Sequence, residues 1–264
     1  MIKEIQQKVK GLLEDGTVKG FLGIREFDGQ LGPCLFTDPN DLDGMSLGDY
    51  QGMGDARYPL NLYLQKIIKK YPDEPIGILV RGCDERGLVS LRSWNQIREH
   101  NVIVTVGFAC AEEQAQICEC AQPYPDKCEF GTKVEPVAWQ SVADVEAMEM
   151  NDRFTFWQTE FNKCIKCYGC RNVCPVCFCN ECSLEDDNLI RRGESPPEIP
   201  IFHLVRAVHM AGRCVDCGLC NDACPMEIPL RTLYKKVAQI LKEDFSYTAG
   251  VDLGKSPLQT LSEA

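Results

Sequence analysis

Two runs of cysteine with the same spacing are the residues of this chain best suited to bind metal. The pattern Cys-x-x-Cys-x-x-Cys-x-x-x-Cys-Pro occurs twice, at Cys164, Cys167, Cys170 and Cys174 and again at Cys214, Cys217, Cys220 and Cys224. Thiolates at this spacing are typical ligands of two [4Fe-4S] clusters. The first three cysteines of a run can surround one cluster. The fourth, followed by a proline that turns the chain, reaches the other cluster.

The runs therefore predict two [4Fe-4S] clusters with crossed ligation. One cluster would be held by Cys164, Cys167, Cys170 and Cys224, and the other by Cys214, Cys217, Cys220 and Cys174. A zinc ribbon is the alternative, but zinc sites normally use two separated pairs of ligands rather than two complete runs of four. Clusters of this kind carry electrons.

Five cysteines in the N-terminal half predict a third [4Fe-4S] cluster. Two of them follow neighbouring predicted strands, and the others share an irregular loop: Cys83, Cys110, Cys118, Cys120 and Cys128. The carboxyl ends of parallel strands meet at one edge of a sheet, where ligands gather in open α/β folds. Which four cysteines would bind is open. A zinc site is the next alternative. The cysteines could instead bind no metal and simply be small buried side chains.

The remaining cysteines and two histidines carry weaker signals. Cys177, Cys179 and Cys182 follow the first run and could form another metal site, replace a ligand or pack against a cluster. Cys34 stands alone, which favours a structural role. His203 and His209 are six residues apart, on different faces of a predicted helix, so we expect packing or surface roles.

The composition limits the class of protein to which the chain can belong. The chain has 264 residues, 17 cysteines and a formal net charge of −11. So many cysteines in tight runs favour metal ligands over disulfides, and the acidity argues against a nucleic-acid partner. We find no signal peptide and no apolar run long enough to span a membrane. These features predict a cytoplasmic protein, and oxygen-labile clusters favour an anaerobe.

The elements that would position these residues differ between the two halves. Residues 1–150 predict an α/β domain with a parallel sheet, in which strands 75–80 and 101–108 flank a helix at 84–99 with Asp84 as its N-cap. A helix at 2–14 and a hairpin with a turn at Asp28–Gly29 precede them. Residues 151–244 predict a mainly α-helical ferredoxin-like domain, with helices at 201–211 and 230–242. Residues 245–264 predict a docking tail.

Both halves resemble known families. The segment from Arg81 to Gly87, Arg-Gly-Cys-Asp-Glu-Arg-Gly, followed by strand 102–107 and Cys110, resembles the beta-subunit family of deazaflavin-linked hydrogenases and formate dehydrogenases. The cysteine runs, with His209-Met-Ala-Gly-Arg-Cys214, resemble the helical ferredoxin domains of heterodisulfide reductase and fumarate reductase subunits.

The resemblance implies a role within a larger assembly. We expect an iron–sulfur electron-transfer subunit of a multi-subunit oxidoreductase rather than an independent enzyme. Its partners would be a flavoprotein, hydrogenase, formate dehydrogenase or heterodisulfide reductase type subunit. Several members of the first family carry a flavin, so FAD is a possible cofactor, although the chain has no Gly-x-Gly-x-x-Gly motif. The alternative is a flavin-containing subunit that itself reduces a deazaflavin-type carrier.

Overall fold

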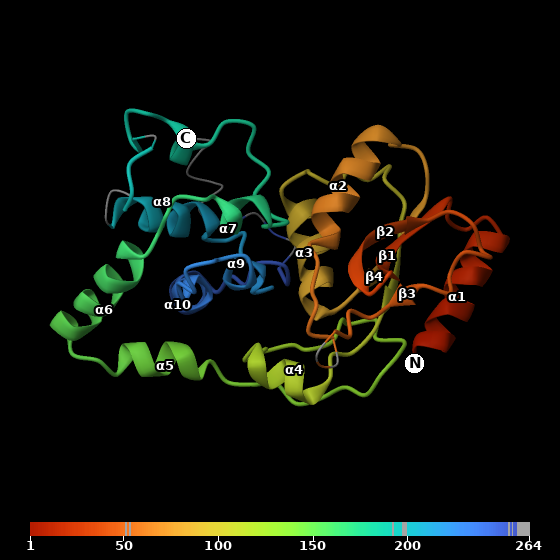
Figure 1. Ribbon diagram of the computed structural model, residues 1–264, viewed down its shortest axis with the longest axis horizontal. Coiled ribbons are helices and arrows are strands. Elements are labelled where there is room, and N and C mark those ends of the chain that lie inside the picture. Colours follow the sequence, from red (N-terminus) through yellow and green to blue (C-terminus); the bar gives the residue numbers. More distant parts are fainter. Residues whose placement is uncertain are drawn as a thin grey trace. The chain divides into compact units, whose positions relative to one another are not determined.

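The chain divides into two compact units. The computed structural model describes residues 1–264 except 51, 53, 192, 197–199, 253, 255 and 258–264. The first unit is Met1–Ala138 and the second is Trp139–Ala264 (Figure 1). This division falls inside the stretch 130–152, in which Gly131 and Pro136 precede the acidic residues 144–152. The functional limits of the domains stay a prediction, and much of the predicted tail lies outside the described residues.

A mixed sheet forms the centre of the first unit. Its strands are β1 (Gly20–Phe27), β2 (Gln30–Phe36), β3 (Met45–Ser46), β4 (Ile76–Val80) and β5 (Ile103–Gly107). They lie in the order β2-β1-β4-β5, and β3 pairs with β1. The pairs β1–β4 and β4–β5 are parallel, whereas β2 and β3 are antiparallel to β1. The predicted parallel pair is therefore confirmed, and the N-terminal hairpin makes the whole sheet mixed.

Local sequence explains the hairpin and the central strand. Asp28 and Gly29 both have positive φ, which is the backbone of the two-residue turn that matches the twist of paired strands. All five residues of β4 are buried, as expected for a strand with parallel neighbours on both edges and helices on both faces. The predicted hairpin is confirmed.

Four helices accompany this sheet in the described residues of the first unit. They are α1 (Ile2–Glu14), α2 (Leu60–Lys70), α3 (Gly82–Ser93) and α4 (Glu112–Ile117). The helices α2 and α3 lie on one side of the sheet and α1 on the other (Figure 1). Helix α1 buries Ile5 and Val9 against the sheet, and α2 buries Leu64. With Phe21 and Ile78 from the strands, these side chains form the core.

The start of α3 corrects one prediction. Asp84 is not the N-cap of the helix, because α3 begins two residues earlier and Arg81 occupies the cap position. The Asp84 carboxylate instead accepts a hydrogen bond from the backbone N–H of Arg81 at 3.0 Å, which satisfies one of the free donors of the first turn. The helix ends at Ser93 rather than near residue 99, because Asn95 takes a positive φ.

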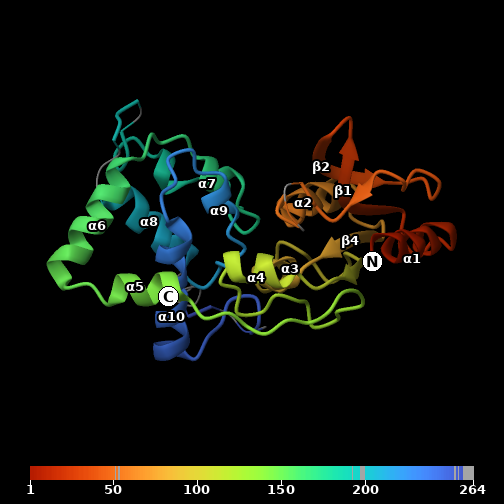
Figure 2. The same ribbon diagram turned by 60° about the horizontal axis from the view of Figure 1, so that its bottom comes forward.

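The regular elements of the second unit, in its described residues, are helices. They are α5 (Gln140–Glu146), α6 (Met150–Asn162), α7 (Gly169–Asn172), the 3₁₀ turn η1 (Ser183–Glu185), α8 (Ile201–Met210), α9 (Leu219–Asp222) and α10 (Leu230–Phe245). Helix α10 packs against α5, α8 and α9, and α7 packs against α9 (Figure 2). Buried side chains such as Phe161, Phe202 and Leu230 fill the space between them.

Two glycines let a loop close over the carboxyl edge of the sheet. A Cβ atom at Gly82, just after β4, would lie 2.3 Å from the carbonyl oxygen of Gln122. A Cβ atom at Gly107, the last residue of β5, would lie 2.2 Å from the carbonyl oxygen of Lys127. Real Cβ atoms do not approach backbone this closely. The segment 122–127 therefore rests directly on the backbone at the two strand ends.

Substitution of Gly107 by alanine tests this close approach. We expect Gly107→Ala to lower the free energy of unfolding by about 2 kcal/mol, because the added methyl group forces the loop away from β5. Urea titrations followed by circular dichroism measure the change. Gly32→Ala is the matched control, since a Cβ atom at Gly32 in β2 meets no atom within 4 Å. Equal stability of the two variants would contradict the packing described here.

Candidate metal centres

The two cysteine runs fold into matching turns. In the first, Lys166 and Tyr168 have φ of +49° and +59°; in the second, the equivalent Asp216 and Gly218 have φ of +53° and +77°. Left-handed residues at the same two places bend each run in the same way. Cys170 and Cys220 then lie in the short helices α7 and α9. The equal spacing of the runs therefore gives equal backbone geometry.

Backbone amides are directed at the first sulfur of each run. The N–H of Lys166 lies 3.4 Å from Cys164 Sγ, and a backbone hydrogen bond from Asp216 lowers the pKa of Cys214 against the effect of burial. Hydrogen bonds of this kind favour the charged thiolate over the thiol. They are also one of the features that set the potential of an iron–sulfur cluster.

The two runs are in direct contact. A Cβ atom at Gly169, in the first run, would lie 2.8 Å from the carbonyl oxygen of Ala223, the residue before Cys224. The same Cβ atom would be 3.6 Å from Cys167 Sγ. Glycine at 169 therefore allows the end of the second run to reach the cysteines of the first.

Charge effects identify which thiols are neighbours in the first group. The pKa of Cys164 is raised to about 11, mainly by burial and in part by the charges of Cys170, Cys167 and Cys224. The charges that raise the pKa of Cys170, after burial, come from Cys167 and Cys224. Because charge effects decline with distance, these cysteines lie near one another. Three belong to the first run and one to the second.

The second group of neighbouring thiols combines three cysteines of the second run with one of the first. Burial raises the pKa of Cys220 well above its usual range, and the charges of Cys217, Cys214 and Cys174 raise it further. Burial likewise raises the pKa of Cys214, with Cys217 and Cys174 contributing. Here three cysteines come from the second run and Cys174 from the first.

The donor set fits iron–sulfur clusters. Soft thiolate ligands select iron–sulfur clusters or zinc, and a bound metal removes the proton that burial would otherwise keep on each sulfur. In the part of the chain that the structure describes, no three His, Cys, Asp or Glu side chains are arranged to hold a single metal ion. The eight motif cysteines suit four-iron groups by number, type and spacing.

The N-terminal cysteines partly converge at the carboxyl edge of the sheet. The pKa of Cys110 is raised to about 11, mainly by burial; the Arg81 cation opposes this effect, and Cys120 and Cys118 add to it. These three cysteines are therefore neighbours. Cys83 lies in the first turn of α3, at the end of β4. The thiol of Cys128 lies 3.3 Å from the carbonyl oxygen of Phe130.

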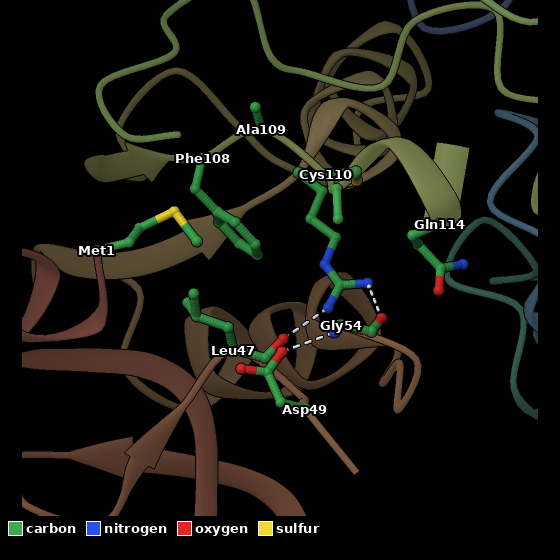
Figure 3. Close-up of a pocket in the computed structure, with 10 residues that line it drawn as sticks. Met1, Leu47, Asp49, Gly54, Phe108, Ala109, Cys110 and Gln114 are labelled. Carbon is green, nitrogen blue, oxygen red and sulfur yellow. Dashed lines mark hydrogen bonds between the residues drawn. The ribbon is translucent and has the colours of Figure 1, made fainter. Parts of the chain in front are cut away.

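A pocket at this edge contains Cys110 and a buried arginine. Phe108, Cys110 and Gln114 line it together with Leu47 and Gly54 (Figure 3). Arg81, only 5% exposed, donates hydrogen bonds to the carbonyl oxygens of Leu47 at 2.7 Å and Gly54 at 3.0 Å. Its guanidinium also lies over the ring of Phe108, 5.4 Å from the centroid.

Arg81 places a positive charge beside the Cys110 sulfur. Sequence reasoning quoted Arg81 within a motif but gave it no role. Its position directly after a buried strand was the signal that could have found it.

The three cysteines behind the first run contact three different arginines. Arg206 Nη1 lies 3.7 Å from Cys177 Sγ, and Arg213 Nη1 lies 3.3 Å from Cys179 Sγ. A hydrogen bond to Cys182 contributes to the raised pKa of Arg171.

These contacts favour roles beside the clusters over a separate metal site. Cys34 lies in β2, paired with Gly23 of β1, at the opposite end of the strand order from β5 and the cysteines that follow it.

His203 packs in the core of the second unit. It is 1% exposed and stacks on Phe161, with ring centroids 4.5 Å apart and an edge contact to Phe202. Burial, together with the Arg206 cation, lowers the pKa of His203 to about 4, so the ring is neutral at neutral pH. His209 is exposed. Both positions match the packing and surface roles expected from the sequence.

Comparison with known proteins supports these observations. A family model described as a 4Fe-4S dicluster domain matches residues 163–229, which include all eight motif cysteines. The F420-dependent formate dehydrogenase subunit beta of Methanocaldococcus jannaschii is 36% identical over 140 residues, covering 52% of this chain and 37% of that protein. The F420-dependent formate dehydrogenase 1 subunit beta of Methanococcus maripaludis is 36% identical over 186 residues, covering 64% of this chain and 48% of that protein.

The predicted resemblance to formate dehydrogenase beta subunits is confirmed, and the chain carries a domain for [4Fe-4S] clusters. The matches span from about a third to about half of the length of these curated relatives. Among the described residues, no helix is both long and apolar enough to cross a membrane.

The buried neutral His203 predicts a pH-dependent stability. The folded-state pKa is about 4 and the unfolded value is about 6.5, so the stability from neutral His203 is complete above 6.5 and is lost as pH falls toward 4. We expect a loss of at most about 3 kcal/mol over this window.

Urea titrations at pH 7.5 and pH 5 would measure this loss in the wild type and in His203→Phe, which should lack it. The exposed His100, changed to Phe, is the control. The same pH dependence in wild type and His203→Phe would contradict the expectation.

Proposed function

We propose that this chain is an iron–sulfur electron-transfer subunit of a multi-subunit oxidoreductase. The observation that carries the proposal is the close contact between the two runs, in which Gly169 of the first run lies against Ala223 of the second, the residue before Cys224. The charge effects among the motif thiols agree with this contact. The dicluster domain at 163–229 supports it. When bound, four-iron clusters supply one-electron transfer without a substrate site of their own.

The chain's own residues would hold and shield the clusters. Cys164, Cys167, Cys170 and Cys224 would hold one cluster, and Cys214, Cys217, Cys220 and Cys174 the other. Side chains next to the ligands, among them Val176 and Ile228, are each 1% exposed and limit the access of water. Burial and hydrogen bonding are the features by which a protein sets cluster potentials.

A third cluster in the first unit would add another electron carrier to the two in the second unit. Cys110, Cys118 and Cys120 supply three neighbouring thiols, and Cys83 is our choice for the fourth because it lies in the first turn of α3, at the same sheet edge. Cys128 remains the alternative fourth ligand. Zinc at this place is the competing metal.

The names of the relatives indicate the kind of complex. Both relatives are beta subunits of F420-dependent formate dehydrogenases, so we propose that this chain assembles with another redox subunit, of dehydrogenase, hydrogenase, heterodisulfide reductase or flavoprotein type. The same names favour one alternative, a flavin-containing subunit that itself reduces a deazaflavin-type carrier. We further propose a location in the cytoplasm.

Cysteine substitutions test the crossed ligation in the anaerobically purified full chain. Cys224→Ala and Cys167→Ala should lose the same electron paramagnetic resonance signal, and Cys174→Ala and Cys217→Ala should lose the other. Each variant should lose about four iron atoms. If Cys224→Ala instead matched Cys217→Ala, each run would hold its own cluster.

The same iron analysis tests the third cluster. The intact chain should contain about twelve iron atoms, and Cys110→Ala about eight. Cys34→Ala is the control and should keep all twelve. Fewer than about eight in the wild type would refute the dicluster proposal itself.

Isolation of the chain with its natural partners tests the role. We expect redox subunits to co-purify with it, and we expect the isolated chain to take up electrons from dithionite but not to turn over a deazaflavin carrier. Release of cofactors by denaturation shows whether flavin is present. Bound flavin together with turnover by the isolated chain would replace the electron-transfer role by the alternative.

A further inference from the structure

Arg206 is a buried cation on the inner face of α8. The side chain is 3% exposed, although arginine is rarely buried without a partner. Its Nη2 donates to the carbonyl oxygen of Cys170 at 2.8 Å, and its Nη1 lies 3.7 Å from Cys177 Sγ. The guanidinium also lies 5.8 Å from the ring centroid of Tyr234.

The ionisable groups around Arg206 are a phenol and thiols rather than carboxylates. Burial opposes its charge, but Tyr234 and the thiolates of Cys174 and Cys170 outweigh this effect and raise the pKa of Arg206. In the described part of the chain, no carboxylate forms an ion pair with it. By contrast, Arg231 pairs with Asp216 at 2.6 Å.

A buried cation without a counter-charge is costly, so Arg206 requires the negative charge of the cysteine sulfurs. Arg206 acts on both proposed ligand sets. Its Nη2 donates to the carbonyl oxygen of Cys170, a residue of the first set, and its side chain hydrogen-bonds to the side chain of Cys174, which belongs to the second. One side chain therefore places its charge between the two groups of sulfurs.

We propose that Arg206 is a positioning residue that raises the reduction potentials of both clusters. The inference rests on the proposed ligation. A cluster that accepts one electron from a reduced donor gains one negative charge, and a fixed cation nearby stabilises that product. Arginine keeps its proton at all working pH values, so the electron arrives without proton uptake by this residue.

Redox titrations of the full chain, followed by electron paramagnetic resonance with dithionite as the reductant, measure this effect. In Arg206→Gln and Arg206→Met, the ratio of reduced to oxidised cluster at a fixed solution potential should fall at least tenfold for both clusters. For a one-electron couple this fall is a shift of 59 mV. Arg206→Lys, which keeps the charge, should shift the ratio by much less.

Arg153→Gln is the matched control, because Arg153 lies in the same unit and pairs with Glu146 at 2.9 Å. It should leave both potentials unchanged. Neutral variants that bind full iron and keep wild-type potentials would overturn the inference, as would a lysine variant that shifts as far as the neutral ones.

If the neutral variants fail to bind their clusters, the iron content of the three Arg206 variants provides the test. Loading that fails in Arg206→Gln and Arg206→Met but survives in Arg206→Lys supports a requirement for the charge. Loss of loading in Arg206→Lys as well would make Arg206 a packing residue and overturn the inference. A wild-type chain with fewer than about eight iron atoms would instead refute the proposed ligation.

Discussion

A buried thiolate is stable only where positive charge or hydrogen-bond donors reach it, because burial favours the neutral thiol. Burial is the largest influence on Cys164, Cys214 and Cys220, and it raises the pKa of each. Backbone amides and Arg206 offset part of this cost, and bound iron would offset the rest. Because the proposed ligands come from both runs, metal binding and folding of the second unit would be coupled.

The first unit meets the same constraint with a different architecture. Instead of repeated turns, the ends of β4 and β5 carry Cys83 and Cys110 to one edge, and Arg81 supplies the positive charge beside Cys110. Glycines at 82 and 107 let the loop 122–127 lie against this edge. A parallel sheet and a pair of helical turns thus place cysteines near a buried arginine in two unrelated ways.

Features set by nearby residues were predictable from the sequence. The Asp28–Gly29 turn and helix α1 depend on local backbone preference and periodicity, and the structure confirms both. The start of α3 was placed wrongly because aspartate is favourable both at the N-cap and within the first turn of a helix. Arg206 had no signal, since its partner Cys170 lies 36 residues away along the chain. Helix α6 was also missed: only Phe161 of its residues is buried, so no apolar period marks it.

The contact between Gly169 and Ala223 has a consequence for how the protein is made. It brings Cys224 to the first run, yet Cys224 is translated 60 residues after Cys164. Under the proposed ligation, neither cluster has its full set of ligands until the ribosome has passed the second run. A partly synthesised chain would expose all four thiols of the first run to oxidation or to the wrong metal. Under this ligation, iron delivery to the protein would be a late step of its biosynthesis, and the nascent cysteines would need protection until then.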